Sequence, residues 1–165
     1  MEVSPGGVNG YGIAMSEPSL VLDRFIPFRL SFTSNLVSDS IARTYQALFG
    51  LSIPEWRVVA VVAETGGVSQ QAICARTRMD KVTVSRAAIA LTGRDLLDRG
   101  RNPDDGRSHL LTLTPAGRAL YAEVAPKALE LERRIFGQIE PAAVDGFVEM
   151  LRRIDTIALD LDRSA

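Results

Sequence analysis

The sequence predicts a mainly α-helical fold in which a helix-turn-helix is followed by a short β-hairpin wing, with N- and C-terminal helices forming a dimerisation region. Two short capped helices follow one another between Ser69 and Leu91. A strand–turn–strand pattern comes directly after them, between Leu96 and Leu113. At both ends of the chain, longer segments carry apolar residues at helical spacing. Two helices and a hairpin in this order are typical of a winged helix-turn-helix.

Residues 1–19 are predicted to be a flexible tail, and a long helix is predicted from Phe28 to Phe49. The tail is rich in Gly, Ser and Pro and lacks the basic and apolar regions of a secretion signal. Pro27 suits the first position of the helix, and Gly50 suits its C-terminal stop. Apolar side chains recur through this segment at helical spacing: Phe25, Phe28, Phe32, Leu36, Ile41, Tyr45 and Leu48.

Three helices are predicted in the middle of the chain, over residues 53–64, 70–76 and 81–91. Each follows a side chain that can accept a hydrogen bond from a free backbone N–H of the first helical turn. These caps are Ser52, Ser69 and Asp80. The connection between the last two helices is brief, from Thr77 to Asp80, as a helix-turn-helix requires.

A hairpin is predicted around Asn102–Gly106, because Asn, Pro, Asp and Gly are typical of a tight turn. Leu96 and Leu97 precede this turn. The alternating Leu and Thr residues of 111–114 follow it and predict a short strand. The two strands would form the wing.

Two C-terminal helices are predicted to begin at Pro115 and Pro141, with Thr114 capping the first. Apolar residues at helical spacing mark both helices: Val124, Ala128, Leu131 and Ile135 in the first, and Val144, Phe147, Val148, Leu151 and Ile154 in the second. These stripes need a surface that covers them. Packing within one chain would supply it, and so would a two-fold dimer built from the first, fifth and sixth helices.

Composition excludes several classes of protein. The chain is 46% hydrophobic and 24% charged, as in an ordinary globular protein. No apolar run reaches the ~20 residues that span a bilayer, so we expect no membrane association and a cytoplasmic location. A single cysteine, Cys74, and a single histidine, His109, cannot form a Cys/His zinc site. We therefore expect no metal, no cofactor and no catalytic residues.

Charge is distributed unevenly along the chain. Between Ser69 and Arg118 there are nine basic and five acidic residues, a local charge of +4, whereas the whole chain carries −1. A basic centre within an acidic frame is typical of a local DNA-binding face.

The helix over residues 81–91 is predicted to carry the DNA-reading face. Projection at about 100° per residue turns Val84, Ala88 and Leu91 inward. The outer side carries residues suited to bases and phosphates: Lys81, Val82, Thr83, Ser85 and Arg86. Arginine can bond guanine with two hydrogen bonds, and hydroxyls reach bases or phosphates. A solvated amphipathic helix that contacts no DNA is the alternative interpretation.

The hairpin tip is the second predicted DNA contact. Arg107 could enter a narrow minor groove, and Asp105 could pair with Arg107 and shape the wing. An ordinary surface ion pair is the alternative for these two residues. His109 follows the tip, where it could contact phosphate, line a pocket or simply be an exposed strand residue.

With these motifs the sequence resembles the MarR (multiple-antibiotic-resistance regulator) family. The wing motif of that family is matched by Asp105-Gly106-Arg107 and by Leu110-Leu111-Thr112-Leu113-Thr114-Pro115-Ala116-Gly117-Arg118. The start of its recognition helix is matched by Thr83-Val84-Ser85-Arg86. Residues 20–160 are covered by the resemblance. The residue between the wing Asp and Arg varies within the family and is glycine here.

The resemblance implies a winged-helix homodimer that binds a pseudo-palindromic double-stranded DNA operator. It also implies a repressor that a small ligand releases. Ser85 and Arg86 would then lie in the major groove and Arg107 in the minor groove. The expected division is a tail (1–19), a first dimerisation helix (20–52), a winged helix-turn-helix DNA-binding domain (53–114) and C-terminal dimerisation helices (115–165).

A small aromatic carboxylate or phenolic compound is the expected effector. A cluster of aromatic residues and an arginine lies at the start of the first helix: Phe25, Phe28, Arg29 and Phe32. Trp56 and His109 are further candidates for contact with the ligand. An apolar slot could hold the ring, and Arg29 could bind the acid. The alternative is that the aromatic residues form a dimer core and the arginine is a surface group.

Two other functions compete with regulation of transcription. An enzyme is disfavoured, because the sequence contains no nucleophile elbow, phosphate loop, dinucleotide-binding glycines or metal cluster. A winged-helix protein-interaction module without sequence-specific DNA binding shares the fold and differs only at the recognition face. Arg86 and the basic central stretch favour DNA binding.

Overall fold

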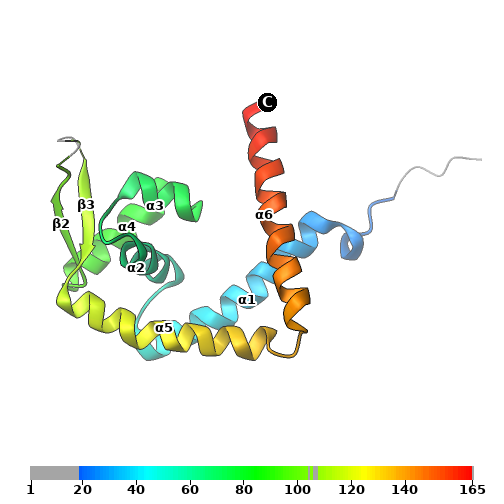
Figure 1. The fold of residues 1–165 in the computed structure, drawn as a ribbon, viewed down its shortest axis with the longest axis horizontal. Coiled ribbons are helices and arrows are strands. Elements are labelled where there is room, and N and C mark those ends of the chain that lie inside the picture. The colour runs from blue at the N-terminus through cyan, green and yellow to red at the C-terminus, as the bar shows by residue number, and fades with distance from the viewer. Residues whose placement is uncertain (1–18, 104, 106–107, 165) are drawn as a thin grey trace, which may run out of the picture. The chain divides into compact units, whose positions relative to one another are not determined.

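A computed structural model describes residues 19–103, 105 and 108–164 of the chain (Figure 1). The predicted winged helix-turn-helix fold, mainly α-helical with a small sheet, is confirmed. The elements in chain order are the 3-10 helix η1 (Leu22–Arg24), α1 (Ile26–Phe49), α2 (Ile53–Thr65), β1 (Val68–Ser69), α3 (Gln70–Thr77), α4 (Lys81–Gly93), β2 (Leu97–Arg101), β3 (His109–Leu113), α5 (Pro115–Phe136) and α6 (Pro141–Ser164).

The chain divides into two compact units within α1, at residues 37 and 38. In the first unit, the described residues comprise η1 and the start of α1, and none of them is buried. Helix α1 begins at Ile26, two residues before the predicted start. Pro27 still lies in the first turn, where proline is tolerated because the backbone N–H has no helical partner there.

The second unit contains the core, to which α2, α3, α4, the sheet and α5 all contribute. Figure 1 shows α2, α3 and α4 gathered beside the β2–β3 hairpin. Among the residues that the structure describes, ten large side chains are fully buried: Leu51, Val58, Val59, Val62, Ile73, Val84, Leu91, Leu97, Leu111 and Val124. Burying a side chain of this kind stabilises the fold by about 1.5–3 kcal/mol. This set packs the helix-turn-helix against its wing.

Local signals place the helix ends as the sequence predicts. Ser52 and Glu55 form a reciprocal capping box at the start of α2, in which the Ser52 backbone N–H donates to Glu55 Oε2 at 2.7 Å. Gly50 and Gly66 adopt positive φ angles of 59° and 72°, which glycine tolerates, at the ends of α1 and α2.

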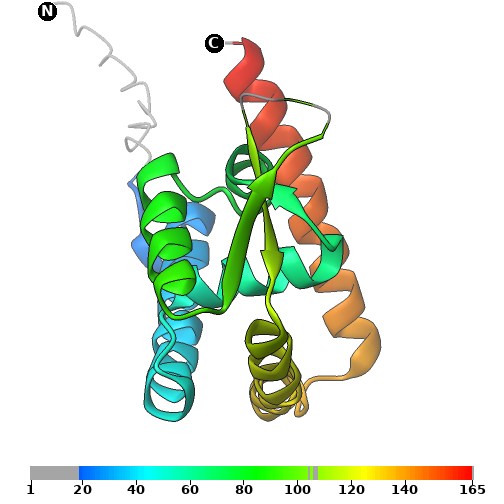
Figure 2. The same cartoon turned by 90° about the vertical axis from the view of Figure 1, so that its left-hand side faces the viewer.

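The sheet has three antiparallel strands in the order β1-β3-β2 (Figure 2). Leu97 pairs with Leu113 at the base of the wing, and Arg101 pairs with His109 near its tip. Strand β1, where Val68 pairs with Leu111, was not predicted. Two residues are too short to show a strand alternation, and this pairing depends on a partner more than 40 residues away.

The start of α5 is tied to the segment that follows α4. Thr114 caps α5 by accepting a hydrogen bond from the Gly117 N–H at 2.9 Å, and its hydroxyl donates to the Asp95 carbonyl at 2.6 Å. Gly117 is buried, and a Cβ atom there would collide with the Leu96 carbonyl oxygen. The glycine of the wing motif is therefore required by close packing.

Helix α6 runs from Pro141, as predicted, and buries none of its residues within the described chain. Several of its apolar side chains are exposed, including Phe147, Met150 and Ile157. Among the described residues, no single helix is long and apolar enough to cross a membrane. Only α1 and α2 taken together, with a 79° bend between them, would meet the length and composition of a span.

Candidate DNA-binding interface

The helix-turn-helix is built from α3, a three-residue turn and α4. Ser69 caps α3 by accepting the Ala72 N–H at 3.2 Å. Arg78 ends α3 in the left-handed region, with φ 56°, which reverses the chain direction. Asp80 then caps α4. The caps Ser69 and Asp80 are confirmed, and the turn lies where the sequence predicts it.

Helix α4 has the two faces that the projection predicts. Val84, Ala88 and Leu91 are buried. Lys81, Val82 and Arg86 are exposed, whereas the Thr83 and Ser85 side chains are partly buried. The exposed face also carries Ile89, which was not predicted to contribute; Val82 and Ile89 are 58% and 69% exposed. Their DNA contacts stay a prediction.

Thr83 has a structural role that the sequence did not reveal. Its hydroxyl donates to Asp80 Oδ2 at 2.6 Å, and its backbone N–H donates to Asp80 Oδ1 at 2.8 Å. These hydrogen bonds, that of the Thr83 side chain first, lower the pKa of the Asp80 carboxyl below its ordinary value. While this cap is formed, the Thr83 hydroxyl can only accept a hydrogen bond from DNA, because its proton is already donated.

The wing loop is organised by Asn102, Asp105 and Ser108. Asn102 Nδ2 donates to Ser108 Oγ at 2.8 Å, and the Asn102 N–H donates to the Ser108 carbonyl at 3.3 Å. The Ser108 N–H donates to the Asp105 carbonyl at 3.0 Å. Asp105 therefore contributes to the loop through its backbone. Arg107, the predicted minor-groove contact, lies outside the described residues, as does Gly106.

His109 and Arg99 face each other across the wing. Arg99 Nη2 lies 3.2 Å from His109 Nδ1. Because a guanidinium can only donate, His109 Nδ1 is the acceptor in this contact. Both side chains are exposed.

The basic side chains between Ser69 and Arg118 differ in whether they have a partner within the described residues. Arg76 forms an ion pair with Glu64 at 2.6 Å, and Arg78 lies 3.7 Å from Asp162. Among the described residues between Ser69 and Arg118, three other basic side chains form no ion pair or side-chain hydrogen bond: Lys81, Arg86 and Arg101. Two of these three belong to the predicted recognition face of α4.

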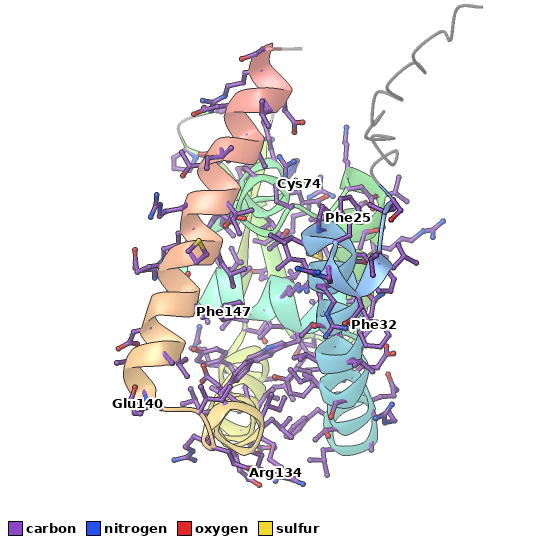
Figure 3. The ribbon with its side chains drawn as sticks, turned by 90° about the vertical axis from the view of Figure 1, so that its right-hand side faces the viewer. Phe25, Phe32, Cys74, Arg134, Glu140 and Phe147 are labelled. Carbon is purple, nitrogen blue, oxygen red and sulfur yellow. The ribbon has the colours of Figure 1, made fainter. Side chains whose placement is uncertain are left out.

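The predicted ligand cluster at the start of α1 forms a local group. The Phe28 and Phe32 ring centroids are 5.9 Å apart, and the Arg29 guanidinium lies 5.5 Å from the Phe32 centroid. Arg29 also pairs with Asp23 at 3.1 Å, which the sequence did not predict. Phe25 and Phe32, both labelled in Figure 3, are exposed.

Trp56 and His109 have neighbours of their own in the second unit. The Trp56 ring stacks on Tyr121 at 5.8 Å between centroids and contacts the edge of Tyr45 at 5.5 Å. It packs against the core, which gives it a structural role. Burial raises the pKa of the Tyr45 hydroxyl. A shared ligand site that includes Trp56 and His109 stays a prediction.

A cavity beside Tyr121 was not predicted. It has a volume of about 360 Å³ and lies between α2, β3 and α5. Its lining residues are Val62, Ala63, Gly66, Thr112, Leu113, Arg118 and Tyr121. No periodicity in the sequence brings these elements together. The described residues contain no group of three or more His, Cys, Asp or Glu side chains that could hold a metal ion.

Comparison with known proteins agrees with this geometry. The model of the MarR family matches residues 49–108, the segment that runs from the end of α1 to the wing. The chain belongs to the MarR family and is a transcriptional regulator, not an enzyme.

Individual relatives extend the likeness beyond the matched segment. The uncharacterized protein Mb2034c of Mycobacterium bovis is 30% identical over 143 residues, 77% of this chain and 99% of that protein. A MarR/EmrR family transcriptional regulator from Acinetobacter sp. ADP1 has a similar fold, with TM-score 0.80 and 23% identity over 86% of this chain and 99% of its own. BpsR of Bordetella bronchiseptica, whose DNA binding is regulated by 6-hydroxynicotinic acid, gives TM-score 0.76 and 26% identity over 84% of this chain and 98% of its own.

Proposed function

We propose that this MarR-family regulator is a homodimeric, cytoplasmic repressor that binds a pseudo-palindromic operator and is released by a small aromatic carboxylate or phenolic ligand. The observation that carries the proposal is the outer face of α4. Lys81 and Arg86 are exposed there without an acidic partner among the described residues. Such donors can contact phosphates and guanine bases directly.

In this proposal, the residues of α4 make different contacts with the operator. Arg86 is the base-reading residue, Lys81 contacts a phosphate at the start of the helix, and Val82 meets a thymine methyl group. Ser85 is a further contact, and Thr83 acts mainly by fixing Asp80. Arg107 enters the minor groove from the wing, whose loop Asp105 helps to shape.

The dimer is inferred from the uncovered apolar side chains of α6. Phe147, Met150 and Ile157 are exposed in a single chain, which is unfavourable in water. A two-fold partner would cover them and would place two copies of α4 about one DNA turn apart, ~34 Å, as a palindromic site requires.

The ligand class is inferred from the aromatic and arginine pairing at the start of α1 and from BpsR. The ligand of BpsR, 6-hydroxynicotinic acid, combines an aromatic ring with a carboxyl group. In this chain, Phe25, Phe28 and Phe32 would contact the ring of such a ligand, and Arg29 would exchange Asp23 for its carboxylate. Trp56 and His109 are further candidates for contact.

The test of the operator function is fluorescence anisotropy with a labelled duplex of the upstream intergenic DNA and a scrambled duplex at the same salt. We expect tight binding to the first and weak binding to the second. Arg86→Ala should remove the difference, whereas Arg133→Ala, an exposed arginine on α5, should preserve it. Equal weak binding of the wild-type protein to both duplexes would contradict operator recognition by this DNA.

A winged-helix protein-interaction module remains the second candidate. Val82 and Ile89, both exposed, follow the same side of α4 as Arg86, and apolar side chains suit a protein partner as well as thymine. An absence of salt-dependent, sequence-selective DNA binding, together with no effect of Arg86→Ala on DNA affinity, would favour this module.

The ligand class is tested in a separate experiment. Trp56 is the only tryptophan in the sequence, so tryptophan fluorescence reports on this one residue. Its fluorescence can be followed as benzoate- and cinnamate-type acids are added, beside calorimetry and operator affinity. We expect weaker operator binding in the presence of the effective acid, and Arg29→Ala should abolish this response. No heat and no change in operator affinity with these acids would contradict the ligand class.

A further inference from the structure

Arg94, the residue that follows α4, joins three helix ends. Its Nη1 donates to the Gly50 carbonyl at 2.9 Å, and its Nη2 donates to the Phe49 carbonyl at 3.2 Å. Both carbonyls belong to the C-terminal end of α1, which lies 44 residues or more earlier in the chain. The planar fork of the guanidinium thus holds two successive carbonyls at once.

The electrostatics of this junction favour a cation. The last carbonyls of a helix have no helical donor and carry a partial negative charge, which a guanidinium stabilises. Arg94 Nη1 also lies 4.0 Å from Glu55 Oε1, in the first turn of α2. The Arg94 and Glu55 side chains are only 39% and 15% exposed. The other oxygen of Glu55 accepts from the Ser52 N–H and hydroxyl, each at 2.7 Å.

The backbone around Arg94 is restrained on its other side as well. Asp95 adopts φ 56°, and its carbonyl accepts the Thr114 hydroxyl at 2.6 Å. The Arg94 N–H caps α4 by donating to the Ala90 carbonyl at 3.2 Å. The end of α4 is therefore attached to α1 through a side chain and to the start of α5 through a backbone carbonyl.

We propose that Arg94 is a positioning residue for operator recognition: it fixes the orientation of α4 relative to α1 without contacting DNA itself. The proposal rests on the proposed dimeric operator binding. In a dimer held through α1, the direction of α4 relative to α1 sets the separation of the two recognition helices. A palindromic operator accepts only a narrow range of such separations.

The first experiment compares Arg94→Lys and Arg94→Ala with the wild-type protein for binding to the operator and to a scrambled duplex, at several salt concentrations. Lysine keeps the charge but cannot bridge two carbonyls as a fork. We expect the ratio of operator to scrambled affinity to fall about tenfold in Arg94→Ala and less in Arg94→Lys. Affinity for the scrambled duplex and the dependence of log affinity on log salt should stay unchanged.

The control variant is Arg118→Ala. Arg118 donates to the Leu113 carbonyl at 2.7 Å, so the variant also loses an arginine-to-carbonyl bond. That bond lies within one short segment and joins no helix ends. The ratio of operator to scrambled affinity in Arg118→Ala should therefore match that of the wild-type protein. Thermal unfolding followed by circular dichroism establishes that each variant is folded at the temperature of the binding assay.

Two outcomes would overturn the proposal. A salt dependence that becomes shallower by about one unit in Arg94→Ala would identify Arg94 as a phosphate contact instead. A folded Arg94→Ala that retains the full specificity ratio would show that the junction does not position α4 for recognition.

A second measurement separates this proposal from the operator function itself. Spin labels at Arg43→Cys in α1 and Ile89→Cys in α4, in a Cys74→Ala background and on one chain of a dimer whose other chain is unlabelled, report the distance between the two helices. We expect one narrow distance distribution with Arg94 and a broader one in Arg94→Ala. An unchanged distribution contradicts the proposal even if the wild-type protein discriminates operators. If the distribution is broader in Arg94→Ala but the wild-type protein does not prefer the operator to the scrambled duplex, the result would contradict the proposed function instead.

Discussion

At the scale of single residues, several polar side chains of this protein complete backbone hydrogen bonding at the ends of helices. Asp80, Ser69 and Thr114 each accept a backbone N–H at the start of a helix. Arg94 supplies donors at the end of another helix. Lys81 and Arg86 have no such task among the described residues, which is why they are the strongest candidates for contact with DNA.

Asp80 gives a prediction for pH dependence. Its carboxyl pKa is lowered in the folded state by the hydrogen bonds from Thr83. A lowered pKa means that the charged cap stabilises the fold above the unfolded-state pKa, about 4, and that this stabilisation is lost as pH falls through the folded-state value. We expect Asp80→Asn to be less stable than the wild type at pH 7, with a difference that shrinks in this acidic range.

Urea unfolding of both proteins at pH 7, 5, 4 and 3 measures this difference. Thr83→Val provides the matched control, because it removes the donor that contributes most to the lowered pKa and should weaken the same pH dependence. A difference between wild type and Asp80→Asn that stays constant or grows toward low pH would contradict the assignment.

Gly117 gives a prediction about packing. A Cβ at this position would collide with the Leu96 carbonyl oxygen, and backbone cannot move aside as a flexible side chain can. We expect Gly117→Ala to destabilise the fold by about 1–3 kcal/mol, the usual range for overpacking. Chemical denaturation measures this loss, and Ala116→Gly at the exposed neighbouring position is the control for a changed helix propensity. A Gly117→Ala variant as stable as the wild type would contradict the close packing.

At the scale of elements, the local sequence determines where each helix begins and ends, whereas contacts with neighbouring elements determine where the helix packs. Helix α5 starts where Thr114 and Pro115 predict it. The same Thr114 hydroxyl then binds the Asp95 carbonyl, which ties α5 to the segment between α4 and the wing. One side chain thus serves a local cap and a contact between elements.

Thr114 should therefore matter for more than helix formation. Thr114→Ala removes the cap and the contact with Asp95, and we expect a loss of about 1–2 kcal/mol from the cap. Thr114→Asn can restore the cap but does not reproduce the short hydroxyl bond to Asp95. Unfolding free energies that decrease from wild type to Thr114→Asn to Thr114→Ala would agree with separate contributions from the cap and from the hydrogen bond to Asp95. Equal values for Asn and wild type would assign the whole effect to the cap.

At the scale of the whole molecule, the described chain leaves apolar side chains uncovered along α6. Phe147, Met150, Ile154, Ile157 and Leu161 follow one another at spacings of three and four residues, so they share one side of the helix. None of them is buried. The core of the second unit is complete without this stripe, which is the physical reason to expect a partner chain there.

The dimer prediction is tested by charge on this stripe. Phe147→Asp and Ile157→Asp place a carboxylate on a side chain that a single chain exposes, so neither should disturb the core of the second unit. We expect both variants to sediment as monomers and to lose operator affinity. Arg152→Asp, on the opposite side of the same helix, changes the charge more and should remain dimeric. Dimers of unchanged stability in both stripe variants would contradict an interface through α6.

Most of the fold was predictable because its signals are local. Capping residues, prolines at helix starts, glycines at helix ends and the Asn102–Gly106 turn act through neighbours a few positions away. The inward face of α4 was predictable for the same reason, since helical period alone turns Val84, Ala88 and Leu91 to one side. The helix and strand boundaries therefore agree closely with the predicted ones.

The contacts of candidate site residues were less predictable. The roles of Trp56 and Arg29 as ligand contacts stay predictions, but the fold gives both residues neighbours that the sequence did not indicate: Trp56 stacks on Tyr121, and Arg29 pairs with Asp23. The hydroxyl of Thr83, whose contact with DNA also stays a prediction, donates to Asp80. A residue type indicates what a side chain can bind, but only the fold shows which neighbours within the chain it contacts.

By itself, the sequence determined the order of the helices from α1 to α6 and of the two wing strands, the caps, the buried side of α4 and the family of the protein. These features depend on residues close together in the chain and on a compact motif. Tertiary structure alone decided the pairing of β1 with β3, the cavity beside Tyr121 and the attachment of α4 to α1 through Arg94. Each of these brings together groups separated by some 40 residues or more, and no local periodicity encodes such a meeting.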